Sequence, residues 1–298
     1  SDDRGRLYVA SGQSLANTGT ILSSGAGTDA NLLEIGGTLD GSGLIDVDHD
    51  LDISLYTTGV ADISSTTLDV ASGTTLNFRG SSASSVVEVD SLTTISGASD
   101  GVVDFSGTVK LQLNGDFGWG AADPALNFSG NVTLDDDGSA RTFTYAGDDL
   151  VLSSDTILSG VSFENDGLLS VSGTAFFGDS FTNNSGATLD LNTALTGGSV
   201  NTTLDGGGTN AGTIVLTAND DVSDDRARLM VSTGDTLASS GTILSDGSGT
   251  SANILDINGT LTTSGLLDID HDLDIDVGSS GSVTLGGTTN VAPGTTLD

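Results

Sequence analysis

The chain has 298 residues, of which 41 are Asp or Glu and only seven are Lys or Arg, so its formal net charge at pH 7 is −34. Such a charge excludes nucleic-acid binding, which needs Lys and Arg against phosphates, and it disfavours contact with anionic lipid. Cysteine is absent, which excludes disulfides, thiolate chemistry and cysteine zinc sites. The partners that such a surface attracts are cations, notably Ca²⁺, which takes oxygen ligands.

Short runs of alternating apolar and polar residues follow one another along the chain, separated by Gly, Asn, Asp, Ser and Thr. This period of two predicts strands with one buried face, and no stretch has a helical period. No apolar run approaches the ~18 residues that are needed to cross a bilayer. We expect representative strands at residues 7–9, 33–35, 51–53, 68–70, 76–78, 109–111, 169–171, 189–191 and 214–216.

The spacing of these strands predicts a coil that repeats. The strand starts Leu33, Leu51 and Leu68 lie 18 and 17 residues apart, which indicates a coil of roughly 17 to 20 residues. Asn-x-Gly turns precede strands, and both residue types tolerate the left-handed backbone of a tight corner. They begin at Asn17, Asn165, Asn184 and Asn210. The pattern predicts an all-β parallel β-solenoid, an elongated rod of stacked coils, although a β-meander barrel uses the same turns.

The sharpest local feature is an acidic run between Leu44 and Ile53. Read as one strand, it places four carboxylates on one face, with neighbouring side chains ~6.6 to 7 Å apart. They belong to Asp46, Asp48, Asp50 and Asp52. One interpretation is a strip that recruits Ca²⁺; the other is a solvated outer face. His49 lies within the run, either as a metal ligand or as a neutral ring bonded to a backbone group.

Aromatic residues concentrate in the middle of the chain, between Phe105 and Phe181. If exposed, Trp119 and Tyr145 would stack on sugar rings and form a glycan-binding patch. The alternative is a stack of phenylalanines inside the coil, capped or widened by a loop at residues 115–120.

A long internal repeat sets the domain organisation. Residues 1–53 return without a gap as residues 223–275, and 35 of these 53 paired positions are identical. We therefore expect residues 1–222 to form the first copy of a β-solenoid module, and residues 223–298 to begin a second copy that is continuous with it. A 222-residue module is expected to make ~11 to 13 coils and to advance ~55 Å. Both ends of the chain look cut from something longer.

The repeat duplicates the acidic run and adds a second cluster at the junction between copies. The duplicated carboxylates belong to Asp268, Asp270, Asp272 and Asp274, and the junction holds Asp220, Asp221, Asp224 and Asp225, followed by Arg226 and Arg228. Cross-coil ion pairs or a metal site would explain such a junction; a polar loop with incidental charges is the alternative.

Residues 14–22 and 184–191 resemble the short repeats of filamentous-haemagglutinin-type adhesins and autotransporter passenger domains. The resemblance implies a right-handed parallel β-helix. It also implies a secreted, surface-attached rod that mediates adhesion or builds an extracellular layer.

These observations predict a non-enzymatic extracellular structural protein, a segment of a long repetitive surface fibre, stalk or layer. Its expected partners are copies of itself, end to end or lateral, or other surface components, with association that depends on Ca²⁺. The alternative is an adhesin that binds glycans through the central aromatic region. A polysaccharide-degrading enzyme comes third, because Lys110, Arg79 and Arg141 are the only basic residues outside the module starts that could stabilise an anionic intermediate.

Overall fold

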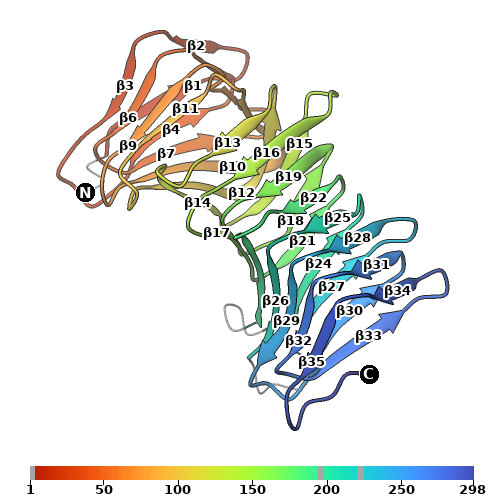
Figure 1. The fold of residues 1–298 in the computed structure, drawn as a ribbon. Helices are drawn as coiled ribbons and strands as arrows, with labels where there is room; N and C mark the ends of the chain where they lie inside the picture. Colours follow the sequence, from red (N-terminus) through yellow and green to blue (C-terminus); the bar gives the residue numbers. More distant parts are fainter. Residues whose placement is uncertain (1–3, 194–197, 220–224) are drawn as a thin grey trace. The chain divides into compact units, whose positions relative to one another are not determined.

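The computed structural model describes residues 4–193, 198–219 and 225–298 (Figure 1). Within these ranges there are strands and turns but no α-helix, and parallel strands stack as a β-solenoid of about 12 turns. The all-β solenoid prediction is therefore confirmed. A meander barrel, whose neighbouring strands run antiparallel, is excluded.

The chain divides into two compact units, Ser1–Phe143 and Thr144–Asp298. The strands of the first unit are Arg6–Val9 (β1), Ser14–Asn17 (β2), Thr20–Ser23 (β3), Asn31–Ile35 (β4), Thr38–Gly41 (β5), Leu44–Val47 (β6), Leu51–Leu55 (β7), Val60–Asp62 (β8), Thr67–Val70 (β9), Thr75–Val89 (β10), Thr94–Gly97 (β11), Val102–Leu113 (β12), Phe117–Trp119 (β13), Ala125–Phe128 (β14) and Asn131–Asp136 (β15). The strand Arg141–Tyr145 (β16) contains the division.

The strands of the second unit are Leu150–Leu152 (β17), Thr156–Ser159 (β18), Val161–Asn165 (β19), Leu168–Val171 (β20), Thr174–Phe177 (β21), Phe181–Asn183 (β22), Thr188–Asn192 (β23), Val200–Leu204 (β24), Gly208–Asn210 (β25), Thr213–Ala218 (β26), Ala227–Val231 (β27), Thr236–Ser239 (β28), Thr242–Gly247 (β29), Asn253–Ile257 (β30), Thr260–Thr263 (β31), Leu266–Ile269 (β32), Leu273–Val277 (β33), Ser282–Leu285 (β34) and Thr288–Val291 (β35).

Each turn of the solenoid contributes strands to three rows. In the first unit, the first row contains β1, β4, β7 and β10. The second row contains β2, β5, β8 and the later part of β10. The third row contains β3, β6, β9 and β11. The long strands β10 and β12 pass through two rows. In the second unit one row runs from β17 to β35, a second from β18 to β33, and a third from β19 to β34.

The coils are less regular in length than the sequence predicts. Leu33 pairs with Ile53 in the next turn, and Phe163 pairs with Phe181, so the predicted coil length fits both of these turns. Ile53 pairs with Phe78, which makes the intervening coil longer than predicted. The three strand starts do not measure a single coil, because Leu68 lies on β9, in a different row from Leu33 and Leu51. With about 12 turns in the whole chain, the number of coils predicted for one module is too high.

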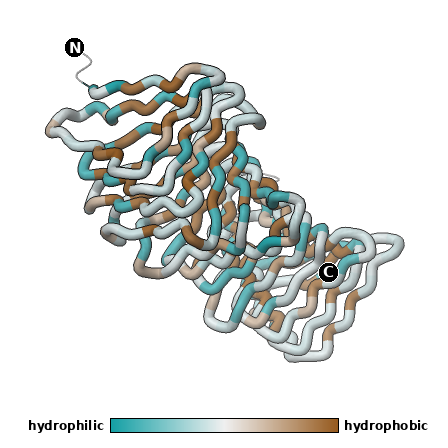
Figure 2. Tube along the Cα trace, turned by 90° about the horizontal axis from the view of Figure 1, so that it is seen from above, coloured by the Kyte–Doolittle hydropathy of each residue, from teal (hydrophilic) through white to brown (hydrophobic). Residues whose placement is uncertain are grey.

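All nine predicted strand segments lie within observed strands. Hydrophobic and hydrophilic residues alternate along the tube in Figure 2, and most of the large apolar side chains that the structure describes are buried. Parallel stacking brings each residue beside its counterpart in the next turn, so like side chains form interior ladders. In the first unit Phe78, Phe105 and Phe128 occupy successive register positions. Their ring centroids are 5.3 and 5.6 Å apart.

A buried ladder of asparagines lines one corner of the second unit. The amide of Asn165 donates to Asn183 at 2.8 Å, and the amide of Asn183 donates to Asn210 at the same distance. Asn210 donates in turn to the hydroxyl of Ser239 at 2.9 Å. The turns predicted at Asn165 and Asn210 are therefore corners of the solenoid, but the third ladder residue is Asn183 and not its neighbour Asn184. Low dielectric strengthens such a chain of hydrogen bonds, provided that every member is paired.

Candidate functional site

The acidic run at residues 44–53 is not one strand. Strand β6 ends at Val47 and β7 begins at Leu51, so Asp48 and Asp50 lie at a corner between two rows of the solenoid. Asp46 and Asp52 therefore face outward from different rows. The second copy has the same break, with Asp268 on β32, Asp274 on β33, and Asp270 and Asp272 between them. The predicted single-faced strip is wrong, because the chain turns a corner between Val47 and Leu51 although the alternation of residue types continues through it.

Hydrogen-bond donors from the next turn occupy two carboxylates of the first copy. Asp50 accepts the backbone N–H of Thr75 at 2.8 Å, and Asp52 accepts the amide of Asn77 at 3.0 Å. Asp48 is exposed. The hydrogen bonds of Asp50 and Asp52 join successive turns, so both carboxylates have a structural role.

Asp46 is less well accommodated, because it lies directly beside Asp69 on β9. Burial raises its pKa, and the charges of Asp48 and Asp69 raise it further. In the second copy the neighbour is Asn290, whose amide donates to Asp268 at 2.7 Å. A repulsive contact in one copy is thus a hydrogen bond in the other.

Asp272, at the corner of the second copy, accepts both the backbone N–H and the hydroxyl of Thr296, at 2.7 and 2.8 Å. These two hydrogen bonds lower the pKa of Asp272. Asp270 is exposed and Asp274 is half-buried. The carboxylates of the duplicated run, like those of the first, therefore have different surroundings and do not form one strip.

No group of three or more His, Asp or Glu side chains suited to hold a metal ion occurs within residues 4–193, 198–219 and 225–298. Asp220, Asp221 and Asp224 of the junction lie outside the described residues, and Asp225 is half-buried just before β27. Calcium binding stays a prediction for this chain.

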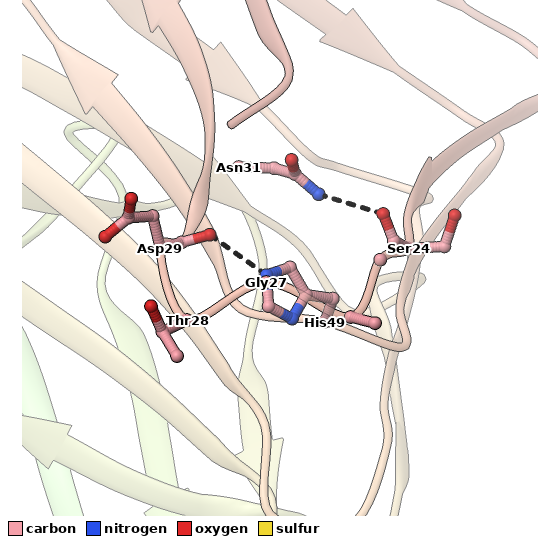
Figure 3. A pocket seen from close by; sticks show the side chains of 8 residues that line it. Ser24, Gly27, Thr28, Asp29, Asn31 and His49 are labelled. Carbon is pink, nitrogen blue, oxygen red and sulfur yellow. Dashed lines mark hydrogen bonds between the residues drawn. The ribbon is translucent and has the colours of Figure 1, made fainter. Parts of the chain in front are cut away.

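His49 holds a glycine-rich loop against the corner of the first copy (Figure 3). The loop runs from Ser24 to Asp29 and, with Asn31 and His49, lines a pocket of about 480 Å³. The Nε2 atom of His49 lies 2.9 Å from the carbonyl oxygen of Asp29. On the other side of the pocket, the amide of Asn31 donates to the carbonyl of Ser24 at 3.4 Å.

The same corner is built a second time at His271. Its Nε2 atom lies 2.9 Å from the carbonyl oxygen of Ser251, which is the counterpart of Asp29. The hydroxyl of Ser23 donates to the backbone carbonyl of His49 at 2.6 Å, and that of Ser245 donates to the backbone carbonyl of His271 at 2.8 Å. Since both copies use the ring in this way, the bonded-imidazole interpretation of the histidines is confirmed, and the pocket follows from a corner that stabilises the coil.

Ion pairs link adjacent turns at the start of each copy. The guanidinium of Arg6 pairs with Glu34, and that of Arg228 pairs with Asp256. Arg6 and the hydroxyl of Tyr56 both donate to Glu34 and lower the pKa of its carboxyl group. The cross-coil ion pairs that the junction pattern suggested are therefore present in both copies.

The glycan patch, which required exposed rings at Trp119 and Tyr145, is contradicted by burial, and the alternative of phenylalanines stacked inside the coil is confirmed. The side chains of Trp119 and Tyr145 are only 3% and 1% exposed, so neither ring offers a face to a ligand. The indole N–H of Trp119 donates to the carbonyl of Pro124 at 2.8 Å, and burial raises the pKa of the Tyr145 hydroxyl. The rings point inward because Trp119 and Tyr145 occupy inward-facing positions on β13 and β16. The predicted loop at 115–120 thus contains a short strand.

One aromatic pair is exposed and was not predicted from the sequence. Tyr8 is 57% exposed and Tyr56 is 44% exposed, and their ring centroids lie 6.3 Å apart in an edge-on contact. Tyr56 also borders a depression of about 360 Å³ whose lining includes Arg79. The alternation of β1 could have placed Tyr8 outside. Tyr56 lies in a turn, where no periodicity indicates direction.

The fold and these contacts define the chain as a parallel β-solenoid built from a repeated module. Comparison with protein-family models, with curated proteins and with solved structures finds no significant match. The part of the chain that the structure describes contains no helix able to span a membrane.

Proposed function

We propose that the chain is a non-enzymatic structural protein of the cell exterior, a segment of a long repetitive fibre, stalk or layer similar to the filamentous-haemagglutinin-like surface proteins. One observation carries the proposal: the repeated segment folds in the same way twice. Strands β1, β4 and β7 stack in the first copy as β27, β30 and β33 stack in the second. A module that repeats its own stacking adds length without a thicker core.

The interior contacts support a mechanical role. Each turn is joined to the next by a continuous parallel ladder, and each backbone hydrogen bond contributes about 1 kcal/mol net. The phenylalanine stack of the first unit and the asparagine ladder of the second add side-chain contacts between successive turns. A pull along the axis would load many such bonds together.

The acidic exterior bears on association between chains. A formal net charge of −34 opposes lateral contact unless cations screen it. We therefore propose that copies associate end to end or laterally in a calcium-dependent way. Light scattering with Ca²⁺ and then with a chelator tests this part, and scattering that does not respond to either would contradict it.

The experiment that tests the proposed function is electron microscopy of intact source cells labelled with an antibody to this chain. Label along fibres, or in a layer outside the envelope, is the expected result. Label confined to the cell interior would contradict it. Release of reducing sugar from acidic polysaccharides by the purified chain, abolished by a point substitution, would favour the enzymatic alternative.

A further inference from the structure

We propose that the depression beside Tyr56 and Arg79 in the first unit binds an acidic sugar, a saccharide that carries a carboxylate. This goes beyond a structural role, since a fibre needs no such site. The depression has a volume of about 360 Å³ and is lined by Ser54, Leu55, Tyr56, Arg79, Gly80, Ser81, Gly107 and Thr108. Ligand pockets begin at about 300 Å³, and this size suits a few sugar rings at most.

The lining of the depression carries a positive charge. Arg79 is the only charged residue in it, although the chain has 41 acidic residues and seven basic ones. Arg6, Arg141 and Arg228 each pair with a carboxylate, whereas Arg79 has no ion-pair partner among the described residues. An exposed guanidinium presents a planar fork of donors that fits a carboxylate with two parallel hydrogen bonds.

An exposed aromatic ring lies at the rim of the depression. The other aromatic side chains that the structure describes are buried or half-buried, and only Tyr8 and Tyr56 are exposed. The hydroxyl of Tyr56 donates to Glu34, and this fixes the ring at the rim of the depression. A tyrosine ring offers an apolar face with a polar edge, which suits a sugar ring that has C–H groups on one face and hydroxyls around it.

The remaining wall supplies hydrogen-bonding groups. Ser54, Ser81 and Thr108 contribute hydroxyls, each able to donate and to accept. Gly80 and Gly107 allow two turns to approach closely beside the depression, because a Cβ on Gly80 would lie 2.0 Å from the carbonyl oxygen of Thr108. The three hydroxyls leave polar groups within reach of a hydroxylated ligand.

Long-range repulsion does not exclude an anion here. Charges separated by more than the Debye length of about 8 Å at physiological salt are largely screened. Glu34, the acidic group bonded to Tyr56, is itself paired with Arg6. Asp52 and Asp104 lie on the same outward faces, two residues before Ser54 and Ser106, and each accepts a side-chain hydrogen bond, from Asn77 and Ser129. Arg79 supplies the only positive charge in the lining itself.

The repeat indicates that these rings are not needed by the coil. The counterpart of Tyr8 in the second copy is Met230, and that of Tyr56 is Gly278. The ion pair and the histidine corner occur in both copies, but the tyrosine pair occurs in the first alone. Since the second copy folds without the tyrosine pair, the pair of the first copy is available for ligand recognition.

The experiment is an NMR titration of the full chain, labelled with ¹⁵N, with trigalacturonate, and with neutral maltotriose as the control ligand. We expect trigalacturonate to shift the signals of Gly80, Gly107 and the Arg79 side chain. Arg79→Gln should weaken binding by about tenfold or more, since a hydrogen bond to a charged group is lost. Tyr56→Ala should also weaken it, whereas Tyr56→Phe keeps the ring and should retain most of it.

Arg141→Gln, which removes the same charge from a different turn, and Met230→Ala, at the second-copy counterpart of Tyr8, are the matched controls and should bind as the parent chain does. Unchanged circular dichroism verifies the fold of each variant. Equal binding of the neutral sugar, undiminished binding by Arg79→Gln, or no binding of trigalacturonate would each overturn the proposal. None of these results would affect the structural role, which is tested on intact cells.

Discussion

The two copies of the repeated segment share 35 of 53 residues but bury some of the shared residues differently. Leu7 on β1 is 52% exposed, whereas its counterpart Leu229 on β27 is fully buried. Strand β27 lies between β24 and β30, while β1 pairs with β4. At the far end of the segment Ile53 is buried and Ile275 is only half-buried. Burial in this fold is therefore set by neighbouring turns on both sides, and identical side chains contribute differently according to position.

The largest expected effect comes from this contrast. Leu229→Ala should lower the free energy of unfolding by about 3 kcal/mol, because it leaves a cavity between two turns. Leu7→Ala removes the same atoms from an exposed position and should cost less than about 1 kcal/mol. Urea denaturation of the two variants measures the difference. Equal losses of unfolding free energy would contradict the claim that contacts from turns on both sides determine how much each leucine stabilises the chain.

The corner ladder gives the next effect. Asn183→Ala breaks the chain of hydrogen bonds: the amide of Asn165 loses one acceptor and the side-chain oxygen of Asn210 loses its donor, at a cost of about 2 kcal/mol. Asn17→Ser is the matched control, since Ser239 occupies the corresponding corner of the second copy. It should change the free energy of unfolding by about 0.5 kcal/mol or less. A harmless Asn183→Ala would mean that the ladder does not stabilise the stack.

The histidine corners should respond alike. His49→Ala and His271→Ala each remove one side-chain contact to a loop carbonyl, so each should cost about 1 kcal/mol in the same denaturation assay. Equal effects would sharpen the view that the ring serves the coil in both copies. An effect at His49 alone would instead point to a separate role for the pocket of the first copy.

The smallest effect concerns Asp46 and Asp69, which face each other where the second copy has Asp268 and Asn290. Asp69→Asn should raise stability at neutral pH by about 0.5 kcal/mol, less at high salt, because it removes a like-charge pair. The pKa of Asp46 is raised in the folded state, so its repulsion is fully present above that pKa.

Acidification supplies the pH test for the same pair. As the pH falls through the folded pKa of Asp46 towards its ordinary value of 3.8, the carboxyl takes up a proton and the parent chain regains this stability. The advantage of Asp69→Asn should therefore shrink over that window. Thermal melts at a series of pH values measure it, and an advantage that stays constant down to low pH would contradict the assignment.

The sequence predicted the strands well and the corners poorly. Alternation is local, so segments such as Leu76 to Phe78 are identified without knowledge of their neighbours. Coil length depends on which strands share a row, and Leu68 belongs to a different row from Leu33. The acidic run shows the same limit, because a corner at His49 leaves the apparent alternation intact.

Site residues were predicted less well for a related reason. Trp119 and Tyr145 were candidates for a glycan patch because of their residue type. Both are buried, as large aromatic side chains often are. Asp46 was placed on the outside correctly, but its repulsive neighbour Asp69 comes from the next turn. Contacts between turns join residues that lie a whole coil apart in the chain, and a single sequence does not reveal that register.

The most direct test of the central claim is the length of particles in electron micrographs of chains that carry one or two additional 222-residue modules. If turns stack along a common axis about 4.8 Å apart, each module should lengthen the particle by about 45 Å at constant width. Particles that instead gain separate compact beads, or that widen without lengthening, would contradict the account.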